Sequence, residues 1–73
     1  MKELDLVVLT RDLPAHSLKA GDVGTIVYAP EAVDSFEVDF VRADGQTVAL
    51  LSLERPDVRP FDGAEILQAR PLV

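Results

Sequence analysis

The stretch SFEVDFVRA, residues 35–43, constrains the fold of this chain more than any other. Apolar and acidic side chains alternate along it, with Phe36, Val38 and Phe40 at one parity and Glu37 and Asp39 at the other. A strict period of two over this length predicts an antiparallel strand with one buried and one solvated face. The chain therefore needs a partner strand that covers the same apolar face.

That partner follows at once. Asp44-Gly45 is a dipeptide typical of tight hairpin turns, and Gln46–Ser52 is a second β-prone run. The turn type decides the register, because a bulge exchanges the two faces of the returning strand. Either Val48 and Leu50 or Ala49 and Leu51 face the phenylalanines, and the sequence leaves both registers open.

Further β-prone runs recur at short intervals, separated by turn residues. We expect strands over Leu4–Thr10 and Val23–Ala29, the latter central, with a long loop over residues 11–20 between them. A single helical turn is expected over residues 54–57, and then a short extended piece ending at Pro60, which cannot occupy a central strand. About five short strands in 73 residues predict a small all-β barrel or sandwich.

Two glycines open the second of these runs. Gly21 and Gly24 lead into a β-branched run, not into a helix, so the loop lacks the helix start that phosphate-binding loops require. We expect Gly21-Asp22 to turn the chain, with Gly21 at positive φ, and Gly24 to mark a bulge or a close backbone crossing. The predicted structural turns are thus Gly21, Asp22, Gly24, Asp44 and Gly45.

The long first loop and the glycine-marked strand resemble an SH3-like barrel of the KOW type. A closer resemblance extends from Leu4 to about Pro60, and it is to the small bacterial family known as domain of unknown function 4926. The motifs that carry it, in order, are Asp5–Leu9, Arg11–Pro14, Gly21–Val27, Phe36–Phe40 and Asp44–Ala49. The resemblance implies an SH3-like barrel of about five antiparallel strands, with no assigned activity, that acts as a partner of other proteins, toxin-like ones included.

The chain then divides into a barrel, residues 1–60, and a C-terminal extension, residues 61–73. Glu65–Arg70 is compatible with either an extra strand or a short helix, which Pro71 would limit. We expect this extension to pack on the barrel or to form a homodimer interface through its apolar residues.

Charge narrows the class of partner. Thirteen acidic and seven basic residues give a net charge of −6, which argues against nucleic acid and anionic membranes and favours a basic protein. The chain has no cysteine and no long apolar segment, so we expect a cytoplasmic location.

Candidate catalytic groups are few. His16 is the single imidazole, and Ser17 beside it is adjacent in sequence without any indication of a catalytic geometry. We therefore predict no catalytic, cofactor-binding or metal-binding residues, and no enzymatic activity. Arg55, Arg59 and Arg70 are expected to pair with acids such as Asp57 and Glu65.

The sequence thus favours a non-enzymatic interaction module that resembles an acidic immunity protein or antitoxin. Its predicted partner-binding residues are Glu37 and Asp39, on one face of their strand, together with Tyr28. Two alternatives stay open: a KOW-like module associated with RNA or the ribosome, and an accessory domain of an enzyme complex.

Overall fold

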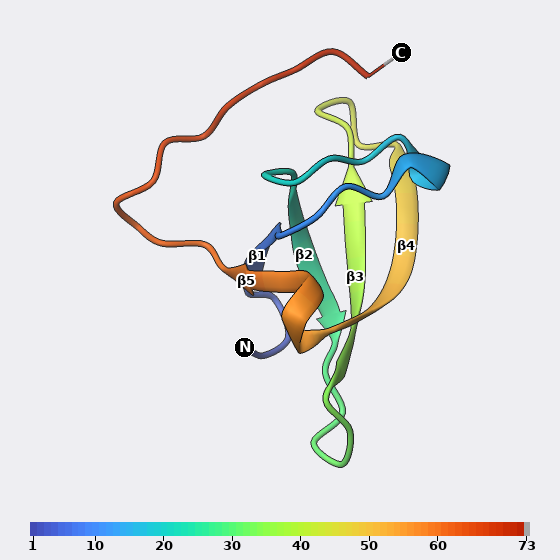
Figure 1. The fold of residues 1–73 in the computed structure, drawn as a ribbon, viewed down its shortest axis with the longest axis vertical. Coiled ribbons are helices and arrows are strands. Elements are labelled where there is room, and N and C mark those ends of the chain that lie inside the picture. Colours follow the sequence, from blue (N-terminus) through green and yellow to red (C-terminus); the bar gives the residue numbers. More distant parts are fainter. Residues whose placement is uncertain (73) are drawn as a thin grey trace.

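The structure, a computed structural model, describes residues 1–72 and consists of one antiparallel sheet of five strands (Figure 1). The strands are β1 (Leu6–Leu9), β2 (Val23–Tyr28), β3 (Ser35–Val41), β4 (Thr47–Glu54) and β5 (Val58–Pro60). Their order is β4-β3-β2-β1-β5. The expected all-β fold of about five antiparallel strands is confirmed, with β2 inside the sheet. The ladder is open, with β4 and β5 at its two edges.

The β3–β4 hairpin has a bulge that settles its register. Phe40 pairs with Ala49, but the next residue, Val41, pairs with Thr47, so Val48 has no direct partner. Ala49 and Leu51 consequently face the same side as the phenylalanines, which resolves the alternative that the sequence left open. Leu50 points the other way and is exposed.

A short 3-10 helix, η2 (Arg55–Asp57), connects β4 to β5, where a single helical turn is expected. It is held against the end of β1: the Thr10 hydroxyl donates to the Pro56 carbonyl at 2.6 Å, and the Thr10 amide donates to the Asp57 carbonyl at 2.9 Å. The chain therefore returns from one edge of the sheet to the other within three residues. Pro60 ends β5 at the sheet edge, as expected.

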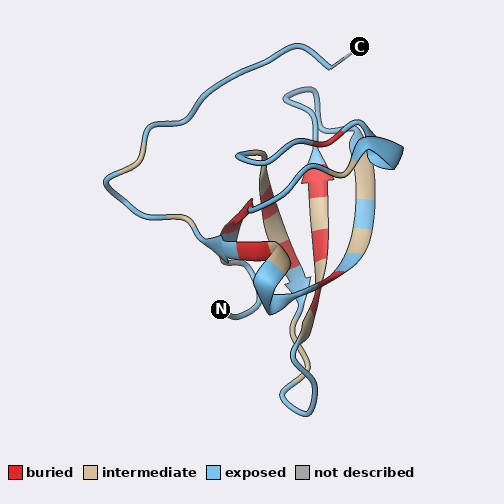
Figure 2. Ribbon diagram, in the orientation of Figure 1, coloured by how far each residue is buried: buried red, intermediate tan, exposed pale blue. Residues whose placement is uncertain are grey.

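The core lies on the concave side of the curled sheet (Figure 2). Every strand contributes to it, and the long loop between β1 and β2 adds Leu18. The buried cluster consists of Val7, Leu9, Leu18, Ile26, Phe36, Val38, Phe40, Leu53 and Val58. Burying apolar side chains of this size stabilises the fold by about 1.5–3 kcal/mol each.

The long loop is anchored at its middle. Leu13 and Leu18 exchange two backbone hydrogen bonds, at 2.9 and 3.2 Å, around the 3-10 helix η1 (Pro14–His16). Leu18 is buried in the core, and Leu13 packs against it half-buried. Both leucines thus serve to hold the loop over one end of the sheet.

Gly24 is the point of closest approach between β2 and the side chains of β3. A Cβ atom at this position would lie 2.6 Å from Val38 Cγ1 and 2.8 Å from Phe40 Cε1. Both side chains are buried, so neither can move away into solvent. Gly24 therefore makes room for side chains of β3, whereas the sequence predicted a bulge or a backbone crossing at this position.

The C-terminal extension differs from the expectation. Asp62–Glu65 makes a turn, and residues 66–72 form neither the strand nor the short helix considered from the sequence. A run of this length is too short to hold a helix alone. The neighbouring edge strand β5 has only three residues and ends in Pro60, which offers no amide for pairing. Val73, the last residue of the predicted extension, lies outside the described residues.

Over residues 1–72, no helix has the length and apolar character that a membrane crossing requires.

Replacing Gly24 with Ala should destabilise the fold by about 1–3 kcal/mol, because the added methyl overpacks the core against Val38 and Phe40. Urea denaturation would measure the change in the free energy of unfolding. Gly63→Ala is the matched control: nothing lies within 4 Å of its added methyl, so a change below about 0.5 kcal/mol is expected. Equal stability of the two variants would contradict the close packing of Val38 and Phe40 against Gly24.

Candidate partner-binding face

The convex side of the sheet presents a row of side chains from four adjacent strands. Leu6 pairs with Thr25, Thr25 with Asp39, and Asp39 with Leu50, from β1 to β4. Asp39 thus stands between a hydroxyl side chain and an exposed leucine. We call this side of β2, β3 and β4 the outer face.

Asp39 is the unusual member of this row. Its Oδ1 atom is buried by its neighbours and has no hydrogen-bond partner, the one such atom among the buried side-chain polar atoms of the described residues. A buried polar atom without a partner typically costs about 1–3 kcal/mol. The side chain as a whole is only half-buried, so the carboxylate stays within reach of an approaching molecule.

Glu37, two residues earlier, lies in the next row of the outer face. The Ser52 hydroxyl of β4 donates a hydrogen bond to Glu37 Oε1 at 2.5 Å. On the other side Glu37 pairs with Tyr28, beyond an irregularity in the β2–β3 pairing that leaves Val27 without a direct partner. The structure therefore brings together all three predicted partner-binding residues: Glu37, Asp39 and Tyr28.

Exposed apolar side chains accompany these acids. Tyr28 and Leu50, the cross-strand neighbours of Glu37 and Asp39, are 56% and 58% exposed, and Leu6 and Val27 are also exposed. Two grooves of the molecule lie beside the C-terminal extension and are lined by other residues. The outer face thus combines negative charge with apolar area on a broad surface, which suits contact with another macromolecule.

Four of the five predicted turn residues lie in turns, and the fifth, Gly24, lies within β2. Gly21 and Gly45 have φ values of +97° and +90°, in the left-handed region that favours glycine. Asp22 Oδ2 accepts a hydrogen bond from the Lys19 amide at 2.8 Å, and Asp44 Oδ1 accepts one from the Gln46 amide at 3.1 Å. Both acids stabilise their own turns, so they have a structural role.

His16 lies in η1 and is exposed, and its neighbour Ser17 takes a left-handed conformation at the end of that 3-10 helix. In the described part of the chain, no three His, Asp or Glu side chains gather closely enough to hold a metal ion together.

The arginines find partners, but only one of the expected pairings is correct. Arg59 donates to both carboxylate oxygens of Glu65, at 2.7 and 2.6 Å. Arg55 pairs with Asp34, at 2.8 Å, and not with Asp57. Its guanidinium also lies 5.6 Å from the centre of the Phe36 ring.

Two further ion pairs join segments that are distant in the sequence. Arg11 Nε donates to Asp57 Oδ1 at 2.8 Å, and Arg70 donates to both oxygens of Asp22. The hydrogen bond from each arginine is the main cause that holds the pKa of its aspartate below the usual value. The partners are 46 and 48 residues apart, so no local pattern in the sequence indicates either pair.

Comparison with known protein families finds a match over the region that contains the sheet. Residues 3–60 match the family described as Domain of unknown function (DUF4926). The chain belongs to this family. The DUF4926 match includes all five strands and every residue of the outer face, and the extension after Pro60 lies beyond it. No curated protein and no solved structure matches the chain.

Asp39→Thr should stabilise the isolated protein by about 0.5–1 kcal/mol, because it removes the unpartnered oxygen and places a β-branched residue in a strand. Glu37→Thr is the matched control, on the same strand and face, but it removes the acceptor of the Ser52 hydroxyl. Thermal denaturation of both variants would measure the difference. A gain no larger for Asp39→Thr than for Glu37→Thr would contradict the cost assigned to the unpartnered oxygen.

The Arg59–Glu65 pair predicts an unusual titration. The hydrogen bond from Arg59, with one from the Asp62 amide, lowers the pKa of Glu65 from 4.5 to about 2. Because the folded pKa is depressed, the pair is complete above pH 4.5 and is lost as the pH falls through about 2. Carbon-13 NMR of the side-chain carboxyl would show this pKa, and Arg59→Gln should return it toward 4.5. A wild-type Glu65 that titrates near 4.5 would contradict the pairing.

Proposed function

We propose that this protein is a non-enzymatic interaction module that binds a basic protein through the outer face. In this role it resembles the acidic partners that restrain a basic enzyme or toxin. The observation that carries the proposal is the Asp39 carboxylate, which has a buried oxygen without a hydrogen-bond partner beside exposed apolar side chains.

The unpartnered oxygen of Asp39 destabilises the fold, which supports a role for this residue in binding and not in stability. A threonine or valine would suit the middle of a strand better, and no ion pair of the described residues uses this carboxylate. A lysine or arginine of a partner would pair with the accessible part of this half-buried carboxylate and neutralise its charge. Tyr28 and Leu50 would then bury apolar area around the charged contact, as aromatic and aliphatic side chains do at interfaces.

The overall charge supports the same class of partner. A net charge of −6 on 73 residues attracts basic surfaces over long range and speeds their association. The same charge opposes RNA, so the KOW-like alternative has no observation in its favour.

The test is affinity capture from the native cell, followed by binding measurements with the recovered protein. Glu37→Lys combined with Asp39→Lys should weaken binding at least about tenfold, because it reverses two charges at the centre of the contact. The recovered partner should be basic, and its association should slow as salt is added.

Glu3→Lys combined with Glu31→Lys is the control with the same change in net charge. Both residues are exposed and make no side-chain hydrogen bond or ion pair within residues 1–72. This variant should retain most of the binding. If the two double variants weaken binding equally, total charge determines it and the outer face is not the site.

A further inference from the structure

The C-terminal extension crosses one end of the sheet without joining it (Figure 1). From residue 66 to residue 72 the backbone makes no hydrogen bond to other backbone groups. Ile66 and Leu67 point into solvent, with 90% and 72% of their surfaces exposed. Regular structure therefore does not hold residues 66–72 in place, and apolar burial contributes only through Leu72, which is 38% exposed.

One side chain attaches this segment to the rest of the chain. Arg70 donates from Nε to Asp22 Oδ1 at 2.9 Å, and from Nη2 to Asp22 Oδ2 at 2.5 Å and to the Ser17 carbonyl at 3.0 Å. The Asp22 side chain is only 19% exposed and is already held by the Lys19 amide. The arginine thus docks on a fixed, partly desolvated carboxylate with the two-pronged geometry that arginine provides and lysine does not.

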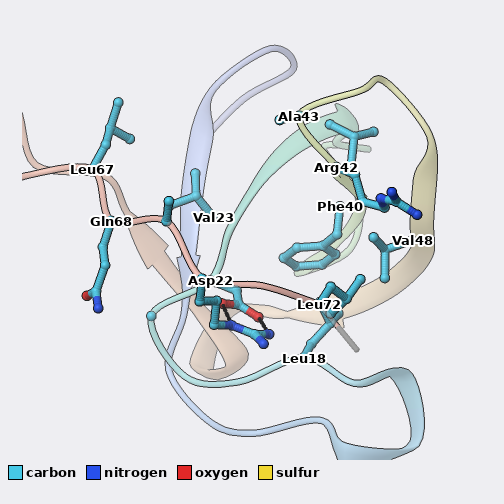
Figure 3. Close-up of a pocket in the computed structure, with 14 residues that line it drawn as sticks. Leu18, Asp22, Val23, Phe40, Arg42, Ala43, Val48, Leu67, Gln68 and Leu72 are labelled. Carbon is cyan, nitrogen blue, oxygen red and sulfur yellow. Dashed lines mark hydrogen bonds and ion pairs between the residues drawn. The ribbon is translucent and has the colours of Figure 1, made fainter.

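Next to this carboxylate is a groove of about 410 Å³ (Figure 3). Apolar side chains of the sheet and the long loop line it, namely Leu18, Val23, Phe40 and Val48. Leu72 of the extension lies near Leu18 at its side, and Leu67 and Gln68 of the extension also line the groove. The groove therefore offers an acid and an apolar surface to an arginine and to a leucine two residues later.

We propose that Asp22 and this groove form a binding site for an extended peptide in which an arginine precedes a leucine by two residues. Arg70–Leu72 is the occupant that the chain itself supplies. The receptor residues lie within the region that matches the family, residues 3–60, and the occupant lies outside it. Negative charge from the nearby Asp12 also favours a cationic occupant. The residues that line this site do not include Glu37, Asp39, Tyr28 or Leu50, so the proposal does not depend on the function proposed for the outer face.

A tethered occupant competes with any free peptide. A short flexible connection gives an effective concentration in the millimolar range, so a weakly binding peptide hardly displaces it. The free site is therefore best observed in the full chain with Arg70→Ala, which removes every hydrogen bond between residues 66–72 and the rest of the described structure.

The probe is a synthetic peptide with the sequence of residues 64–72, titrated into nitrogen-15-labelled Arg70→Ala protein up to about 10 mM. Saturable shifts are expected at the amides of Leu18, Asp22, Val23 and Val48. Wild-type protein should bind the peptide at least about tenfold more weakly, because its own extension competes. A peptide with lysine in place of the arginine should also bind more weakly, because lysine cannot form the two-pronged contact.

Asp22→Asn in the Arg70→Ala background should abolish binding, while its side-chain oxygen still accepts from the Lys19 amide and keeps the turn. Glu3→Gln in the same background removes one charge elsewhere and should leave binding unchanged. Equal affinity of wild-type and Arg70→Ala protein, or binding that survives Asp22→Asn, would overturn the proposal. A wild-type dimer that Arg70→Ala converts to a monomer would overturn it as well, since the occupant would then belong to a second copy.

Discussion

The fold depends on how closely β2 approaches the side chains of β3 at Gly24. Because this residue has no side chain, Val38 and Phe40 fill the space directly beneath the β2 backbone. The sheet can then curl tightly enough for β5 and the loop carrying Leu18 to cover the same small core. A chain of 73 residues can bury only a small core, and this curl lets all five strands contribute apolar side chains to it.

Two sets of acidic residues differ in the groups that bind their carboxylates. Asp22, Asp57 and Glu65 each accept hydrogen bonds from an arginine and from a backbone amide, so their charge is neutralised within the fold. Glu37 and Asp39 lie on the outer face, where a serine hydroxyl is the one donor within the described chain. The outer face therefore carries two neighbouring acids that no cation of the described residues neutralises, whereas other unpaired acids, such as Glu3 and Glu31, lie outside this face.

Local patterns in the sequence were enough to predict the strands, because alternation and turn residues act over a few positions. The β3 strand and the Asp44-Gly45 turn are of this kind. The β4 register was not predictable, since it depends on a bulge at Val48 that the packing of the core selects. The pairing of Arg70 with Asp22 was not predictable either, because only the tertiary structure brings these two residues together. The acidic pair on β3 was predictable, but the unsatisfied oxygen of Asp39 required coordinates.

The attachment of residues 66–72 by a single side chain has an evolutionary consequence. Substitutions, insertions or deletions in this segment disturb no ladder and open no cavity in the core, so the sheet tolerates them. The groove beside Asp22, by contrast, is built from residues that the fold itself requires, such as Leu18 and Phe40. Descendants of one ancestral domain can therefore diversify in their C-terminal segments while they keep the same groove beside Asp22.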